Sequence, residues 1–252
     1  MNKNDSRLAT ISIYCLAYLI KICIPMRWRI ACKNLERLYP KAEAEKIAWA
    51  SYIHLSRLMY YSRNLKRSLK NKTVVVNDPE ALDALLNTPR VIMFSGHLGL
   101  WEFVPFVMQQ LTNNKPQNWL YKKSSVKILD KWLYSLRQGE DIDIWDSRTE
   151  LKDALKSFKK NGHLGMAADQ GGGYVSNFFG IPMKFPIGAK KIVERYDIPC
   201  YFFSCMYKDG DIKIHVKRLS NDSIMESYIA QLESVIKTYP EQYYWVHRLW
   251  RV

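Results

Sequence analysis

The sequence of 252 residues predicts an α/β fold: a mixed central sheet flanked by helices, with an N-terminal membrane-associated helix. Two observations predict the sheet. Short apolar runs alternate with segments of helical periodicity through the middle of the chain, and turn residues separate them. A third observation, an apolar stretch over residues 8–24, predicts the N-terminal helix. We therefore expect a membrane anchor or interfacial helix over residues 1–30 and a folded domain over residues 31–252.

The apolar N-terminal stretch contains one charge, Lys21, and is followed by Arg27, Trp28, Arg29 and Lys33. A membrane-spanning helix needs about 20 predominantly apolar residues, so this stretch is marginal for spanning. Basic and aromatic residues at its end suit anionic lipid headgroups. It predicts a membrane anchor or a deeply inserted interfacial helix, and the alternative is a core helix of a soluble domain.

The elements that follow are predicted from periodicity and turn chemistry. Helices are expected over residues 41–70, 79–86, 100–111, 149–161, 187–196 and 223–238, with Asp78 as the N-cap of the second. Strands are expected over residues 74–76, 91–94, 119–121 and 163–169, and a hairpin over residues 200–207 and 212–219. Three glycines, residues 171–173, lack the Lys-Ser/Thr of a phosphate-binding loop and predict a turn.

Composition limits the classes of partner and cofactor. The formal net charge is +14, which indicates an anionic partner such as acidic lipid, a phosphorylated substrate or nucleic acid. The five cysteines show no CxxC pair or disulfide framework, which fits reduced thiols in a cytosolic environment. No histidine stands at metal-ligand spacing from another histidine or cysteine. We expect neither a metal nor an organic cofactor.

The stretch SGHLGLWEF, residues 95–103, carries the candidate chemistry. A strand that ends just before His97 would place this imidazole at the carboxyl edge of the sheet, where open α/β sheets bind ligands. Glu102 is five residues further, about 140° around a regular helix, so the pair can meet only if His97 precedes the helix. Glu102 would then hold the Nδ1 proton while Nε2 takes a proton from a hydroxyl. Free N–H groups at the helix start would bind a developing oxyanion.

Three separated motifs extend this hypothesis to most of the chain. SGHLGLWE, ADQGGGYVSNFFGIPMKFPIGAKKIVERYDIP and YPEQYYWVHRLW, in this order, resemble the bacterial lipid A biosynthesis (late) acyltransferase family. The resemblance implies a lysophospholipid (glycerolipid) acyltransferase-like fold, with residues 31–252 as the acyltransferase domain. It also implies transfer of a fatty acyl chain from a thioester of acyl carrier protein to a hydroxyl of a phosphorylated glycolipid. The active site would face the cytoplasm at the inner membrane.

Residue by residue, the resemblance makes His97 the catalytic base and Glu102 its acidic partner. It places the following residues at the substrate: Tyr121, Lys122, Asp169, Gln170, Phe178 and Phe179. Two positions depart from the family pattern. Lys122 stands where an arginine is usual and lacks the planar fork that binds phosphate in two places, and Leu249 also replaces a common arginine.

Several alternatives remain open. The same chemistry could act on a phosphoinositol mannoside, an amino-acid lipid or a lysophospholipid, and acyl-CoA could replace the carrier protein as donor. A non-catalytic basic membrane-binding adaptor and a nucleic-acid-binding protein belong to other classes. His97 and Glu102 argue against the adaptor, and the apolar N-terminus argues against nucleic acid.

Overall fold

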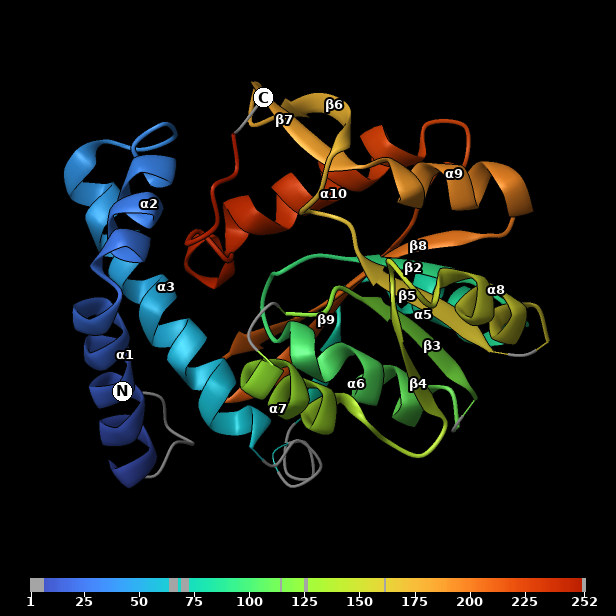
Figure 1. Ribbon diagram of the computed structural model, residues 1–252, viewed down its shortest axis with the longest axis horizontal. Coiled ribbons are helices and arrows are strands. Elements are labelled where there is room, and N and C mark those ends of the chain that lie inside the picture. Colours follow the sequence, from blue (N-terminus) through green and yellow to red (C-terminus); the bar gives the residue numbers. More distant parts are fainter. Residues whose placement is uncertain are drawn as a thin grey trace.

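The computed structural model describes residues 7–63, 68, 73–113, 115–124, 127–160 and 162–250. A seven-stranded sheet in the order β1-β9-β8-β2-β5-β3-β4 occupies the centre, and helices cover both of its faces (Figure 1). The strands from β8 to β4 run parallel to one another, whereas β9 is antiparallel to β8. The predicted fold class, α/β with a mixed central sheet, is confirmed.

The strands of this sheet are β1 (Val74–Val76), β2 (Ile92–Ser95), β3 (Gln117–Tyr121), β4 (Ile142–Asp146), β5 (His163–Ala167), β8 (Cys200–Lys208) and β9 (Asp211–Arg218). A separate antiparallel hairpin is formed by β6 (Gly173–Phe178) and β7 (Ile181–Pro186). Its two turn residues, Phe179 and Gly180, both have positive φ, as a type I′ hairpin turn requires. The sequence predicted neither β4 nor this hairpin.

The helices are α1 (Arg7–Cys23), α2 (Pro25–Leu35), α3 (Lys41–Ser62), α5 (Pro79–Asn87), α6 (Val104–Leu111), α7 (Lys127–Arg137), α8 (Leu151–Lys160), α9 (Ile187–Tyr196) and α10 (Ile224–Thr238). Two 3-10 turns are η1 (Trp101–Phe103) and η2 (Pro240–Gln242). Asp78 caps α5 as predicted, accepting a 2.9 Å hydrogen bond from the Ala81 N–H. The helix expected over residues 41–70 ends as α3 at Ser62, and most of its remainder lies outside the described residues.

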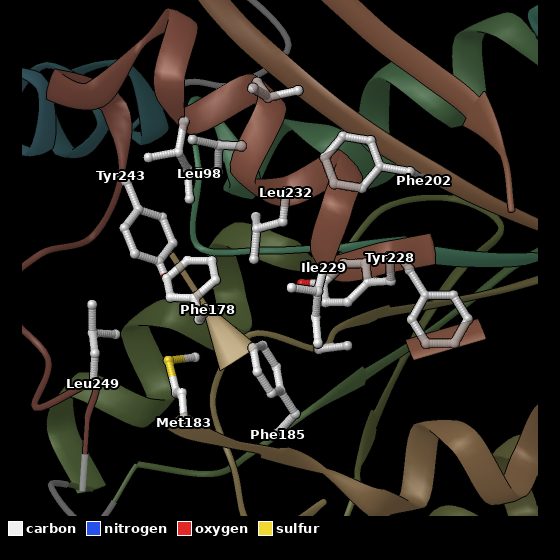
Figure 2. Packing of buried hydrophobic residues seen from close by; sticks show 14 of the residues in the cluster. Leu98, Phe178, Met183, Phe185, Phe202, Tyr228, Ile229, Leu232, Tyr243 and Leu249 are labelled. Carbon is white, nitrogen blue, oxygen red and sulfur yellow. The ribbon is translucent and has the colours of Figure 1, made fainter. Parts of the chain in front are cut away.

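Two apolar layers enclose the sheet. Phe94 of β2 packs on one side with residues of α8, α9 and α10, while the adjacent Met93 packs on the other with α5 and α6. A sheet with both faces covered by helices is typical of parallel α/β folds. Figure 2 shows Phe178 of the β6–β7 hairpin in one cluster with Leu232 of α10 and Tyr243 near the C-terminus.

The N-terminal helices form a bent pair beside α3 (Figure 1). Ala9, Ile13 and Ala17 are buried along one face of α1, while the large apolar side chains on its other faces are exposed. Pro25 begins α2 after a non-helical residue, and the two helix axes differ by 96°. No single described helix is long and apolar enough to cross a membrane, although α1 and α2 together meet those criteria. The predicted division at residue 30 falls inside α2 and stays a prediction.

Candidate active site

The candidate site lies at the carboxyl ends of three adjacent parallel strands. β2, β5 and β3 are neighbours in the sheet, and their ends lead to His97, Asp169 and Tyr121. Residues that are 72 positions apart in the sequence therefore meet at one edge. This is the edge at which open α/β sheets place their ligands, as predicted for His97.

The His97 side chain is held by Asp169. Its Nδ1 atom lies 2.8 Å from Asp169 Oδ1, and its backbone N–H donates to Oδ2 of the same carboxylate at 2.9 Å. The expectation that Glu102 would hold Nδ1 was wrong. Asp169 is fully buried, whereas 30% of the His97 side chain is exposed. With Nδ1 directed at the buried carboxylate, Nε2 lies on the accessible side, and no group in the described residues hydrogen-bonds to it.

The opposite charges of His97 and Asp169 offset the cost of burying them. Burial lowers the pKa of His97, but the charge and hydrogen bond of Asp169 outweigh burial and leave this pKa raised. Burial alone would raise the pKa of Asp169, but its hydrogen bonds and the charge of His97 lower it. Asp169 is therefore ionised near neutral pH, where it accepts the Nδ1 proton and leaves Nε2 as a base.

Glu102 belongs to a second buried ion pair close to the first. Arg137 donates from Nε to Glu102 Oε2 at 2.7 Å and from Nη2 to Oε1 at 2.6 Å, and the Trp101 indole also donates to Oε1. Burial raises the pKa of Glu102, yet the charge and hydrogen bonds of Arg137 lower it overall. Glu102 lies in the 3-10 turn η1, and its carboxylate binds Arg137 at the end of α7 and not the imidazole. Its charge still contributes to the raised pKa of His97.

The sequence did not indicate a role for Arg137, because α7 was not predicted. Its guanidinium completes a bidentate pair with Glu102, a geometry that arginine favours over lysine. The only hint in the sequence is the amphipathic pattern KILDKWLYSLR that precedes it. Spacing along the chain gives no indication that residues 35 positions apart would pair.

The backbone around His97 is fully engaged by the protein. The four N–H groups of residues 97–100 donate to the Asp169 carboxylate and to the carbonyls of Gly96, Gln242 and Cys205. No helix begins at His97, so the expected free N–H groups for an oxyanion do not occur at these four residues. Gly99 has a φ of +63°, and an added Cβ would lie 2.2 Å from the Cys205 carbonyl oxygen. Glycine is therefore required at this position.

The C-terminal segment over residues 242–250, here called the strap, forms one wall of the site. Tyr243 forms an antiparallel bridge with Leu98, and the Tyr244 N–H donates to the His97 carbonyl at 3.0 Å. The rings of Trp101 and Tyr244 lie 5.8 and 5.9 Å from the imidazole, measured between centroids. The imidazole is thus bordered by two aromatic side chains that limit its rotation.

Residues 8–252 match the sequence profile of the bacterial lipid A biosynthesis acyltransferase family. The chain belongs to this family. It is therefore an O-acyltransferase that takes an acyl donor and a lipid acceptor, and the resemblance seen in the sequence is confirmed.

Among solved structures, one similar chain is the 1-acyl-sn-glycerophosphate (LPA) acyltransferase, PlsC, from Thermotoga maritima. The two chains share 13% identity with a TM-score of 0.42, over 92% of this chain and 96% of that one. Similarity at this level identifies no substrate. No curated protein matches the sequence.

Two further residues that the family resemblance assigned to the substrate lie at the end of β3. The Tyr121 ring lies 5.7 Å from the Arg137 guanidinium, and burial together with nearby acidic groups raises the pKa of this phenol to about 12. Tyr121 therefore packs beside the Glu102–Arg137 pair as a neutral group. Lys122 follows it and is exposed.

Gln170 directly follows Asp169 and is half-buried. Its Nε2 atom is buried and lacks a hydrogen-bond partner within the described residues. Buried amide donors are nearly always paired, so this unpaired donor next to Asp169 in the sequence is an exception. The sequence assigned Gln170 to substrate binding only through the family resemblance.

Phe178 and Phe179 take different places in the acyltransferase. Phe178 is completely buried and packs against the ring of Tyr243 (Figure 2). It also contacts the ring of Trp250, so its ring belongs to the core. Phe179 is half-buried, and its N–H donates to Glu233 of α10 at 2.6 Å. Phe179 is thus the member of the pair that an acyl chain could contact without rearrangement of the core.

Proposed function

We propose that this acyltransferase moves a fatty acyl chain from an acyl-carrier thioester to a hydroxyl of a lipid A precursor-type glycolipid. One observation carries the proposal: the buried Asp169 carboxylate holds Nδ1 of His97 and leaves Nε2 accessible. This arrangement fixes the tautomer that a general base needs.

In the proposed reaction, Nε2 of His97 removes the proton from the acceptor hydroxyl. The oxygen forms a bond to the thioester carbonyl carbon, and the tetrahedral intermediate collapses with cleavage of the carbon–sulfur bond. The imidazolium, stabilised by Asp169, then returns the proton to the leaving thiolate. A thioester is already activated, so no acyl-enzyme intermediate is required. The amide of Gln170 is the candidate donor to a substrate oxygen.

Charge around the site suits a phosphorylated acceptor. Lys123 lies 3.9 Å from Asp146 and Lys190 lies 3.0 Å from Glu194, so both have acidic neighbours. Lys122 has no ion-pair partner among the residues that the structure describes, and it adjoins Tyr121 at the site. We assign Lys122 to an acceptor phosphate, as a point charge without the bidentate geometry of arginine. The net charge of +14 also suits an acidic carrier protein as donor.

The outer faces of α1 suit the inner membrane as the location of the enzyme. Leu8, Ile11, Leu19 and Ile22 are 76%, 59%, 58% and 73% exposed. Apolar side chains gathered along one helix mark a membrane or partner surface. Lys21 does not extend away from the helix, because its Nζ lies 3.8 Å from the centroid of the Trp28 ring. We propose that α1 and α2 lie in the cytoplasmic leaflet and that the catalytic domain faces the cytoplasm.

The test uses the purified full chain with acyl carrier protein loaded with a fatty acid and a lipid A precursor as acceptor, with products identified by mass spectrometry. His97→Ala should lower turnover by about 10² to 10⁴-fold if the imidazole is the general base. His215→Ala is the matched control, because this imidazole lies on β9 against Tyr239, and β8 separates β9 from β2 in the sheet. Near wild-type transfer by His97→Ala would refute the assignment. Transfer to a lysophospholipid but not to the glycolipid would refute the acceptor.

A further inference from the structure

The strap connects the catalytic loop to the N-terminal helices. On one side, the Gly99 N–H donates to the Gln242 carbonyl at 2.8 Å and the Tyr244 N–H donates to the His97 carbonyl at 3.0 Å. Gln242 is itself fixed by two side-chain hydrogen bonds to the backbone of Tyr207, at the end of β8. The strap therefore holds the carbonyl of His97, while Asp169 holds its N–H.

On its other side the strap is held by α2. The side-chain amide of Asn34 donates from Nδ2 to the carbonyls of Trp245 and His247, both at 2.7 Å. Arg27, about two turns earlier on the same face of α2, donates from Nη1 to the Val246 carbonyl at 3.0 Å. Three consecutive carbonyls of the strap are thus bound by side chains of one short helix.

The side chain of Asn34 is buried, and its hydrogen-bond donors are used only by the strap. It is 7% exposed, so its amide faces the protein interior, where an unmade hydrogen bond is costly. Both of its N–H groups are used, and both acceptors are backbone carbonyls more than 200 residues away. Aspartate has the same size but no donor, and would set a carboxylate against two carbonyl oxygens.

We propose that Asn34 is a positioning residue for His97, acting through the strap. The expected effect on catalysis rests on the proposed function. The expected effect on the position of the His97 imidazole does not. Asn34 fixes the carbonyls of Trp245 and His247, and the preceding residue Tyr244 binds the carbonyl of His97. The imidazole thereby keeps its place against Asp169. The helices proposed to contact the membrane and the catalytic base are thereby joined by one chain of hydrogen bonds.

The experiment compares Asn34→Leu, which lacks both donors, with Asn34→Gln, which retains them on a longer side chain. Asn221→Leu is the matched control, because the Asn221 amide also donates to two acceptors, Asp197 and the Ile198 carbonyl, far from the strap. The first readout is the NMR titration of the His97 imidazole in full-length protein labelled on histidine. Its resonance is identified by its absence from the spectrum of His97→Asn.

The charged and titratable groups around the His97–Asp169 pair are Asp169 itself, Glu102, Arg137, His247, Tyr243 and Tyr244, and all are retained in these variants. Asn34→Leu is expected to move the His97 titration toward lower pH, because a loosened imidazole loses contact with Asp169. In the acyl-transfer assay it should lower kcat about 10-fold and change KM little, as a misplaced catalytic group does. Asn34→Gln should recover part of both effects, and Asn221→Leu should lower only the melting temperature.

Unchanged His97 titration and kcat in folded Asn34→Leu would overturn the proposal. If that variant does not fold, the exposed Arg27→Met removes the single bond to Val246 and should shift the titration in the same direction by a smaller amount. No shift in folded Arg27→Met would then overturn it. The titration needs no substrate, so an inactive wild-type protein would contradict the proposed function alone.

Discussion

The active-site edge of the sheet and the outer side of α1 both contain side chains in an unfavourable environment, but only the first region offsets that cost within the chain. At the sheet edge, the buried groups Asp169, Glu102 and Arg137 are costly to remove from water, and each is paired within the chain. On α1 the costly groups are exposed apolar side chains such as Leu8 and Ile22, and the described chain does not cover them. The first region can be understood from the chain alone. The second requires an external apolar phase, which we propose is the membrane.

The largest expected effect comes from removing the charge of Asp169. In Asp169→Asn the amide can present its N–H to Nδ1 and favour the wrong tautomer of His97, so kcat/KM should fall by about 10² to 10⁴-fold. Steady-state kinetics would measure this. Glu102→Gln is the comparison, because Glu102 does not contact Nδ1. An equal loss in the two variants, with no difference in stability, would contradict the separate roles assigned to the two carboxylates.

The second prediction concerns the stability of the Glu102–Arg137 pair. Glu102→Leu or Arg137→Met alone leaves one charge buried without its partner, and should lower the free energy of unfolding by about 3–5 kcal/mol. The double variant removes both charges and should lose much less than the sum of the two single losses. Urea unfolding of all three would measure this. Strictly additive losses would show that the two side chains are not coupled.

The membrane side of the comparison is tested on α1. Ile22→Glu is expected to weaken binding to vesicles containing anionic lipid by about 10-fold or more, because burial of a large apolar side chain stabilises by about 1.5–3 kcal/mol. Ile22 is 73% exposed, so the melting temperature should not change. Val175→Glu, at a 52% exposed residue of the β6–β7 hairpin, is the control. Equal vesicle binding by the wild type and Ile22→Glu, in a flotation assay, would contradict the proposed location.

The smallest expected effect is a shift in pH dependence. A general base must be neutral, so kcat/KM should fall as the pH decreases through the pKa of His97. Because Asp169 leaves this pKa raised, the acid limb should lie above about 6.5, the value for a free imidazole. In Asp169→Asn that limb should move to lower pH. A limb that stays in place in the variant would show that the titrating group is not paired with Asp169.

Local chemistry made much of the fold predictable. Helix α9 was expected over its observed residues, the N-cap at Asp78 was recognised, and the β8–β9 hairpin follows from two strand-like runs across a glycine turn. The strand β4 and the helix α7 were missed, although β4 alternates apolar and charged residues and α7 has an amphipathic pattern. The β6–β7 hairpin was missed because its turn, Phe179-Gly180, lacks the usual Asn-Gly or Asp-Gly pair.

The sequence by itself determined the α/β class, the family and the place of His97 at the end of a strand, because periodicity and local motifs depend on neighbouring residues. Only the tertiary structure decided which carboxylate holds the imidazole. Asp169 reaches Nδ1 of His97 because β2 and β5 are adjacent in the sheet. Glu102 binds Arg137 because the end of α7 lies beside it. Strand order and helix packing are settled by the whole chain at once, so spacing along the sequence cannot predict them.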